Sequence, residues 1–279
     1  MKLSIITVNL NNATGLQKTI ESVLSQTFSD YEYIVIDGGS TDGSVDVIRQ
    51  YSDRITQWSS EPDRGIYHAM NKGILQAKGE YCQFLNSGDW IIQPCGLQYV
   101  FEKKPVEDIV YCIQQSRKDI WACGDQLSYL NFFELSIPHQ AAFIKRTLFS
   151  TVGLYNEENK IVSDWEFYIK AIIKSQCSYR YIPFLLVFFT GSGISENPVF
   201  QELHYKEREK VLKEMYPLMY DDYRKFVSQK QELSIYRHSR LIQCVIKIQK
   251  NGFYQTVNRT MKAIVRFMRS LFHHKILAD

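Results

Sequence analysis

The chain has 279 residues, of which 45% are hydrophobic and 23% charged, a composition typical of a globular protein with one sizeable core. Its longest apolar run, residues 184–189, is far shorter than the roughly 20 residues of a membrane-spanning helix. The formal net charge of +3 is uneven, because residues 236–279 carry nine basic side chains and one acidic one. Composition therefore excludes a disordered chain and a membrane-spanning one, and it sets the C-terminal segment apart.

The six cysteines are widely spaced and form no Cys-x-x-Cys pair, so they do not suggest a zinc site. The first residues form a short apolar run followed at once by Asn and Gly, which is typical of a strand and not of a signal peptide. We therefore expect a cytoplasmic protein with reduced thiols.

Strands and helices alternate through the first half of the chain. Continuous apolar runs predict strands at Leu3–Val8, Tyr31–Ile36, Ile55–Ser59 and Tyr81–Leu85. Helical spacing of apolar residues predicts helices at Leu16–Leu24, Val45–Tyr51 and Ile66–Ala77. This order predicts an α/β fold with a mostly parallel sheet and helices on both faces. Ligands of such sheets bind at the carboxyl ends of the strands, where residues 37–43 and 86–89 lie.

The second half is less regular. It predicts strands near Ile109–Ile113 and Tyr179–Val187, a loop carrying His139, and a helix that begins at Ser163. From Gln201 onward the pattern is helical and charged. We expect a catalytic domain at 1–200, with a nucleotide-sugar half at 1–112 and an acceptor half at 113–200. A helical, basic extension at 201–279 would follow.

Two acidic residues could carry chemistry. Asp89 closes Asn-Ser-Gly-Asp at a strand end, where a carboxylate suits a divalent cation, although these residues are also common in plain turns. Asp164 lies in Ser-Asp-Trp-Glu, which has the form of a capping box and predicts the first turn of a helix. There it could be a catalytic base, or it could simply stabilise the helix N-terminus.

Two basic residues are weaker candidates. His139 follows a proline in a polar break, so a metal ligand, an acceptor contact and a structural histidine are all open. Arg64 could pair with a phosphate or be a solvated loop charge.

Seven segments together resemble the family 2 nucleotide-sugar glycosyltransferases, which have the GT-A fold. In chain order they are Ser4–Asn9, Ser22–Thr27, Ile36–Ser44, Glu61–Tyr67, Ala69–Gly73, Phe84–Asp89 and Ser163–Phe167. The resemblance runs to about Ser195, roughly two thirds of the chain. One such motif is weak evidence, whereas seven in the right order are specific.

The resemblance implies a role for each matching polar residue. The donor-binding residues would be Thr7, Asn9, Asp37, Arg64, Asn71 and Asn86. Asp37 would contact the base and Arg64 would lie near the diphosphate. Asp89 would bind Mn²⁺ or Mg²⁺, with His139 as a second candidate ligand, and Asp164 would be the catalytic base. The reaction would be a single displacement that inverts the anomeric centre.

Two departures qualify this picture. Gly38 stands where many relatives carry a second Asp, and Asn86-Ser87-Gly88-Asp89 keeps only the last carboxylate of an Asp-x-Asp-Asp pattern. The Asn-Ser-Gly-Asp form resembles a subgroup associated with capsule, O-antigen and exopolysaccharide assembly.

The expected donor is a UDP-sugar, and the expected acceptor is a glycan or an undecaprenyl-diphosphate-linked oligosaccharide. The alternative is a catalytically inactive nucleotide-sugar-binding or scaffold subunit, for which the missing carboxylates are the best support.

The C-terminal segment predicts a basic amphipathic helix, with apolar residues from Tyr254 to Leu271 at spacings of three and four. Such a helix could lie on the anionic inner face of a bacterial plasma membrane, or it could pack on the catalytic domain or in a dimer. Nucleic acid is not an expected partner, because the segment lacks interleaved aromatic residues and any known motif.

Overall fold

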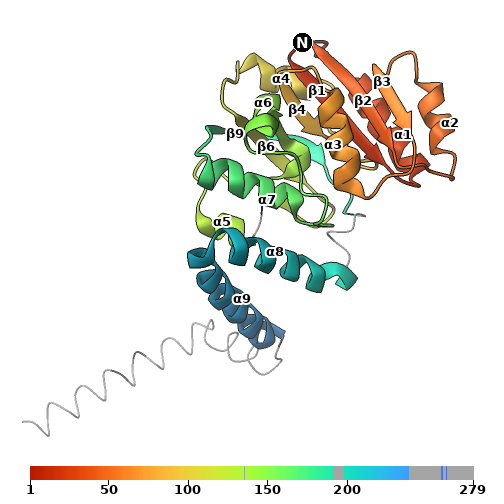
Figure 1. Cartoon of the computed structure of the whole chain (residues 1–279). Coiled ribbons are helices and arrows are strands. Elements are labelled where there is room, and N and C mark those ends of the chain that lie inside the picture. The colour runs from red at the N-terminus through yellow and green to blue at the C-terminus, as the bar shows by residue number, and fades with distance from the viewer. Residues whose placement is uncertain (135, 192–197, 239–258, 260–261, 263–279) are drawn as a thin grey trace, which may run out of the picture. The chain divides into compact units, whose positions relative to one another are not determined.

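The structure is a computed structural model, and it describes residues 1–134, 136–191, 198–238, 259 and 262 (Figure 1). Within these residues no helix is both long and apolar enough to cross a membrane. The predicted amphipathic helix between Tyr254 and Leu271 lies outside the described residues, apart from Arg259 and Lys262.

The described strands form one sheet in the order β3-β2-β1-β4-β8-β6-β9-β5, with β7 paired to β6. Their bounds are β1 Leu3–Asn9, β2 Tyr31–Asp37, β3 Gln57–Ser60, β4 Tyr81–Phe84, β5 Trp90–Ile91, β6 Ile109–Gln115, β7 Ile120–Trp121, β8 Ala142–Lys145 and β9 Tyr179–Phe188. Strands β1 to β4 are parallel, whereas β8 pairs antiparallel with both β4 and β6. The predicted mixed, mostly parallel α/β architecture is confirmed.

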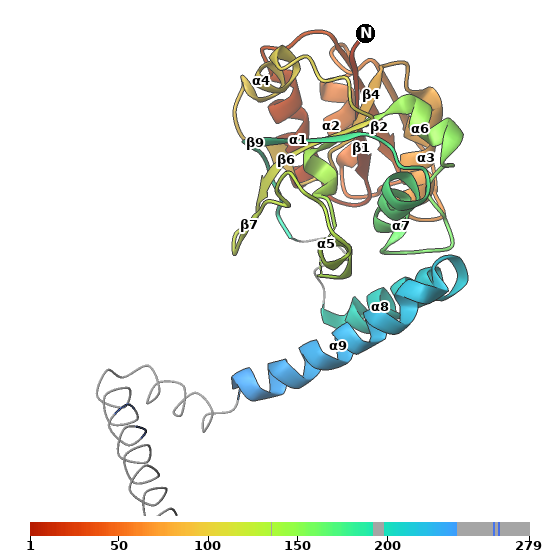
Figure 2. The ribbon, with the colours of Figure 1, turned by 90° about the vertical axis from the view of Figure 1, so that its left-hand side faces the viewer.

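Helices cover both faces of this sheet (Figures 1 and 2). The helices before residue 200 are α1 Ala13–Leu24, α2 Ser44–Gln50, α3 Ile66–Gln76, α4 Gly96–Glu102, α5 Tyr129–Glu134, α6 Arg146–Thr151 and α7 Ser163–Ile169; α8 Gln201–Met215 and α9 Pro217–His238 follow along the chain. Every helix predicted in the first half is present, and so is the one predicted at Ser163. The short elements α4, α5, α6, β5, β7 and β8 were not predicted.

Successive side chains of β1 point alternately to the two faces of the sheet. Leu3 and Ile5 join Leu16 and Ile20 of α1 in the main hydrophobic cluster. On the opposite face Ile6 lies so close to Gly73 of α3 that a Cβ added to this glycine would clash with it. The sheet is therefore buried on both faces, which explains why its strands are continuous apolar runs.

The chain divides into two compact units, Met1–Pro217 and Leu218–Asp279. Helix α8 belongs to the first unit, so residues beyond 200 take part in the same body as the sheet. The expected boundary at residue 200, and the division at 112, stay predictions.

Candidate active site

The carboxyl ends of β1 and β2 carry Asn9 and Asp37 side by side. The Asp37 carboxylate accepts hydrogen bonds from Asn9 Nδ2 at 2.7 Å, from Ser40 Oγ at 2.6 Å and from Ser60 Oγ at 2.6 Å. It also accepts from the backbone N–H groups of Gly39 and Ser40. Burial opposes ionisation, but these hydrogen bonds outweigh it and lower the pKa of Asp37. Asp37 thus fixes the loop after β2 and has little capacity left for a ligand.

A pocket of about 580 Å³ opens beside these strand ends. Its polar lining includes Asn9, Asn12, Asp63, Asn86 and Asp89. The Oδ1 atoms of Asn9 and Asn86 are buried and have no hydrogen-bond partner within the described part of the chain. Because a buried oxygen without a partner is costly, these two atoms are suited to a bound ligand.

Asp63 is a site residue that the sequence analysis missed. It lines the same pocket, and its Oδ1 accepts from the backbone N–H of Gly65 at 2.8 Å. A Cβ added to Gly38 would lie 2.5 Å from Asp63 Oδ2. Gly38 stands where many relatives carry a second aspartate. Because it has no side chain, it leaves room for the carboxylate of Asp63, which lies in another loop.

Asp89 is 3% exposed, and its Oδ1 accepts from the backbone N–H of Thr190 at 2.9 Å and from the Thr190 hydroxyl at 3.1 Å. Burial raises the pKa of Asp89 to about 7. Among the described residues there is no group of three or more His, Cys, Asp or Glu side chains that could hold a metal ion. Asp89 and Asn86 nevertheless supply hard oxygen atoms to the pocket, a donor set that fits Mn²⁺ or Mg²⁺ completed by diphosphate oxygens and water.

Four predicted donor-binding residues lie outside the lining of this pocket: Asp37, described above, and Thr7, Arg64 and Asn71. Thr7 is buried in β1, where its hydroxyl contacts the Tyr33 hydroxyl at 3.0 Å. Arg64 forms an ion pair with Glu157 at 2.6 Å, and Asn71 donates to the Tyr155 carbonyl at 2.9 Å. Arg64 and Asn71 therefore tie α3 and its preceding loop to residues 155–157. Their roles at the donor stay predictions.

Asp164 lies in the first turn of α7, where Tyr67 of α3 holds it. The Tyr67 hydroxyl lies 2.9 Å from Asp164 Oδ1 and 2.6 Å from the Ile161 carbonyl oxygen. Burial and the Asp164 charge raise the pKa of Tyr67 well above its usual value, so the hydroxyl stays protonated and can donate. Tyr67 is a second functional residue that sequence reasoning missed, although it lies inside a recognised motif.

The predicted capping box at this helix is wrong. Val162, not Ser163, is the N-cap residue, and no side chain of the cap forms the expected hydrogen bond. Glu166 instead accepts from Asn159 Nδ2 at 2.6 Å. The loop before α7 is capped from another helix, because the Glu207 carboxylate of α8 accepts from the backbone N–H groups of residues 160–162 at 2.7, 3.0 and 3.2 Å.

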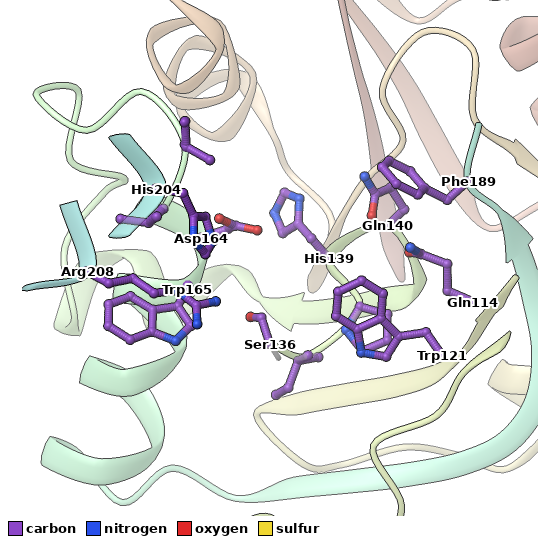
Figure 3. Close-up of a pocket in the computed structure, with 14 residues that line it drawn as sticks. Gln114, Trp121, Ser136, His139, Gln140, Asp164, Trp165, Phe189, His204 and Arg208 are labelled. Carbon is purple, nitrogen blue, oxygen red and sulfur yellow. The ribbon is translucent and has the colours of Figure 1, made fainter. Parts of the chain in front are cut away.

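A second pocket, of about 190 Å³, lies around the Asp164 carboxylate (Figure 3). His139, Trp165, His204 and Arg208 are among its lining residues, and Figure 3 shows the carboxylate pointing toward His139. A hollow of about 110 Å³ adjoins both pockets, because it shares Asn86 with the lining of the first and His139 and Asp164 with the lining of the second. One cleft thus runs from the strand ends to Asp164.

His139 lies in an aromatic cluster. Its ring stacks on Phe84 with 5.0 Å between centroids, and its Nε2 lies 2.9 Å from the Tyr155 hydroxyl. Burial lowers the pKa of His139, which favours the neutral ring. His139 lines the two pockets near Asp164 and not the one that holds Asp89, so its assignment as a metal ligand stays a prediction.

Comparison with known proteins identifies the family of this chain. The sequence matches the model of glycosyl transferase family 2 over residues 4–148. A PGL/p-HBAD biosynthesis glycosyltransferase of Mycobacterium tuberculosis is 31% identical over 205 residues, which cover 70% of this chain and 79% of that protein. A second M. tuberculosis protein, an uncharacterized glycosyltransferase, is 32% identical over 215 residues, with coverages of 70% and 77%. The chain belongs to glycosyl transferase family 2, and it is a glycosyltransferase.

Solved structures show the same fold. S. aureus TarS superposes with a TM-score of 0.59 at 20% identity, over 68% of this chain and 37% of TarS. This chain thus spans well under half of that structure. The mannosyltransferase PcManGT from Pyrobaculum calidifontis, solved with GDP-Man and Mn²⁺, has a TM-score of 0.57 at 14% identity, over 94% of this chain and 84% of that one. The expected GT-A fold is confirmed.

Proposed function

We propose that this glycosyltransferase transfers a sugar, with inversion, from a UDP-sugar to a hydroxyl of a glycan or lipid-linked oligosaccharide in bacterial surface polysaccharide synthesis. The single cleft carries this proposal: oxygen atoms suited to a cation and a nucleotide lie at one end, and a fixed carboxylate lies at the other. Such a cleft places a donor and an acceptor on opposite sides of a reacting carbon.

Asp164 is the proposed base. The acceptor oxygen attacks the anomeric carbon as the bond to the nucleoside diphosphate breaks, and the acceptor proton passes to Asp164. Attack from the side opposite the leaving group inverts the anomeric configuration. A cation held by Asp89 and Asn86 would neutralise the leaving diphosphate. Tyr67 and the loop capped by Glu207 keep the base in place.

The donor and acceptor classes draw on relatives. TarS has been solved with UDP and with UDP-GlcNAc, which supports a UDP-sugar, whereas PcManGT holds GDP-Man. The M. tuberculosis relative is a PGL/p-HBAD biosynthesis glycosyltransferase, which supports a biosynthetic role in a bacterium. Membrane attachment through residues 236–279 completes the proposal, because the chain carries nine basic side chains there.

The test combines donor binding with stereochemistry. UDP-, GDP- and dTDP-sugars are titrated calorimetrically with and without Mn²⁺ against wild type, Asp89→Ala and Asp164→Asn. We expect cation-dependent binding of a UDP-sugar that weakens at least about tenfold in Asp89→Ala. Asp164→Asn should bind the donor normally but lose about 10²–10⁴-fold in turnover. Binding limited to GDP- or dTDP-sugars would reject the UDP assignment. A product with retained configuration by NMR would reject the mechanism.

A further inference from the structure

Two polar side-chain atoms near Asp164, Gln114 Oε1 and Ser136 Oγ, are buried and have no hydrogen-bond partner in the described chain, and the buried Trp121 Nε1 has only the weak acceptor of the Cys123 sulfur. All three residues line the pocket that contains the Asp164 carboxylate (Figure 3). Gln114 is only 3% exposed, so water reaches its side chain poorly. Because unsatisfied buried polar groups are costly, this cluster is suited to a ligand that both donates and accepts hydrogen bonds.

The chemistry of the cluster favours a sugar ring. The Gln114 carbonyl accepts, the Trp121 indole donates, and the Ser136 hydroxyl does either, which matches the adjacent hydroxyls of a pyranose. The rings of Trp121 and Phe189 add apolar surface for the C–H face of such a ring. The pocket of about 190 Å³ lies below the range of about 300–1,000 Å³ for drug-sized ligands, so it suits a single ring. A lipid chain would leave Gln114 Oε1 and Ser136 Oγ without partners.

The cleft continues past these residues. Gln114, Trp121 and Phe189 also line a neighbouring pocket of about 360 Å³ along the β6–β7 hairpin. Its other polar lining residues are Ser116, Lys118 and Asp119. A glycan whose terminal sugar lies beside Asp164 can therefore extend past Trp121 into this second polar pocket.

We propose that the acceptor is a glycan with at least two sugar residues. Its terminal sugar would occupy the pocket beside Asp164, and the next sugar would occupy the pocket beyond Trp121. Gln114, Trp121 and Ser136 would then determine acceptor specificity. This inference rests on the proposed transfer reaction, since it assigns the acceptor end of the same cleft.

The experiment compares acceptors of one and two sugar residues. Methyl glycosides of hexoses and the corresponding disaccharides are offered to wild type, Gln114→Ala, Ser136→Ala and Trp121→Ala with the donor that binds. Gln115→Ala is the matched control, because Gln115 is the next residue of β6 and lines none of the described pockets. In wild type we expect kcat/KM to be about tenfold higher for a disaccharide than for its monosaccharide. Trp121→Ala should abolish this preference, and Gln114→Ala and Ser136→Ala should raise the acceptor KM without raising the donor KM.

Two readouts separate the inference from the reaction on which it rests. Hydrolysis of the donor without acceptor reports the transfer machinery alone. Hydrolysis together with equal use of mono- and disaccharides, or transfer only to alcohols without a sugar ring, would overturn the acceptor assignment and leave the proposed function standing. Absence of both hydrolysis and transfer in a folded wild type would contradict the proposed function itself. Loss of the disaccharide preference in Gln115→Ala would also count against the assignment.

Discussion

At the scale of single residues, some polar groups of the site have hydrogen-bond partners within the protein and others do not. Asp37 is saturated by hydrogen bonds, whereas Asn9 Oδ1 and Asn86 Oδ1 are buried and remain open within the described residues. Asp164 is fixed through Tyr67. Some side chains of the site are therefore available to a ligand, and other side chains hold them in place.

The Tyr67 hydroxyl is expected to position the base. Tyr67→Phe keeps the buried ring but removes the hydroxyl, whose one proton is shared between Asp164 Oδ1 and the Ile161 carbonyl oxygen. We expect kcat to fall about tenfold with an unchanged donor KM, because a neutral donor to a carboxylate is worth on the order of 1.5 kcal/mol. Steady-state kinetics measure this split, and Tyr99→Phe, on a partly exposed ring of α4, is the control. An unchanged kcat would show that Asp164 is held without Tyr67.

Gly38 is expected to influence donor binding through Asp63. Gly38→Ala places a methyl group against Asp63 Oδ2, so the carboxylate must shift from its position in the lining of the donor pocket. We expect donor affinity to fall about tenfold, and Asp63→Ala to have a similar effect. If displacement of Asp63 is the cause, the double variant should be no worse than Asp63→Ala alone in a calorimetric cycle. Additive losses would contradict this explanation.

At the scale of elements, α8 is part of the catalytic unit although the family match ends at residue 148. Glu207 caps the loop before α7, and Arg208 donates to the Phe133 carbonyl at 3.0 Å and lies over the Trp165 ring at 4.7 Å. The helix that carries Asp164 thus depends on a helix about forty residues later. The second half of the site is assembled by these contacts.

Removal of Glu207 should loosen this assembly. Glu207→Ala leaves the backbone N–H groups of residues 160–162 without their acceptor, so we expect a loss on the order of 3 kcal/mol in the free energy of unfolding. Urea denaturation measures it. Glu202→Ala is the matched control, because Glu202 lies in the same helix and forms an exposed ion pair with Lys206, which solvent screening makes weak. Equal losses in the two variants would refute the capping role.

At the scale of the whole molecule, two histidines near the cleft connect pH to stability. Burial lowers the pKa of His204 to about 4 and also lowers the pKa of His139. An unfolded histidine titrates near 6.5, so between pH 6.5 and 4 the unfolded chain binds more protons than the native one. The stability that comes from keeping these rings neutral is therefore full above pH 6.5 and is lost as the pH falls.

The neutral His204 makes acidification from pH 6.5 toward 4 lower the melting temperature of the metal-free protein, whereas Asp89, whose pKa is raised to about 7, opposes this fall because the native state takes up its proton first. His204→Gln should therefore shift the slope of melting temperature against pH toward smaller losses on acidification than in wild type. Thermal unfolding at half-unit pH intervals measures the slope, and His68→Gln, outside the described pockets, is the control. A slope identical in wild type and His204→Gln would contradict a buried neutral His204.

The sequence by itself determined the alternation of elements and the polar clusters at the strand ends. Apolar periodicity is local, so β1 and β2 and the positions of Asn9 and Asp37 follow from short segments. The same holds for Asp164 in the first turn of α7, although its capping-box partner was wrong. Parallel strands bring their carboxyl ends to one edge whatever the detailed packing is.

Only the tertiary structure decided which atoms of these clusters are available. Arg64 is paired with Glu157, Asp63 fills the space beside Gly38, and Glu207 replaces the expected local cap of α7. Each of these contacts joins segments far apart in the chain, and the Glu157 and Glu207 contacts satisfy a charge and N–H groups that local sequence leaves open. Such partners are selected by burial and geometry, which no periodicity in a single sequence encodes.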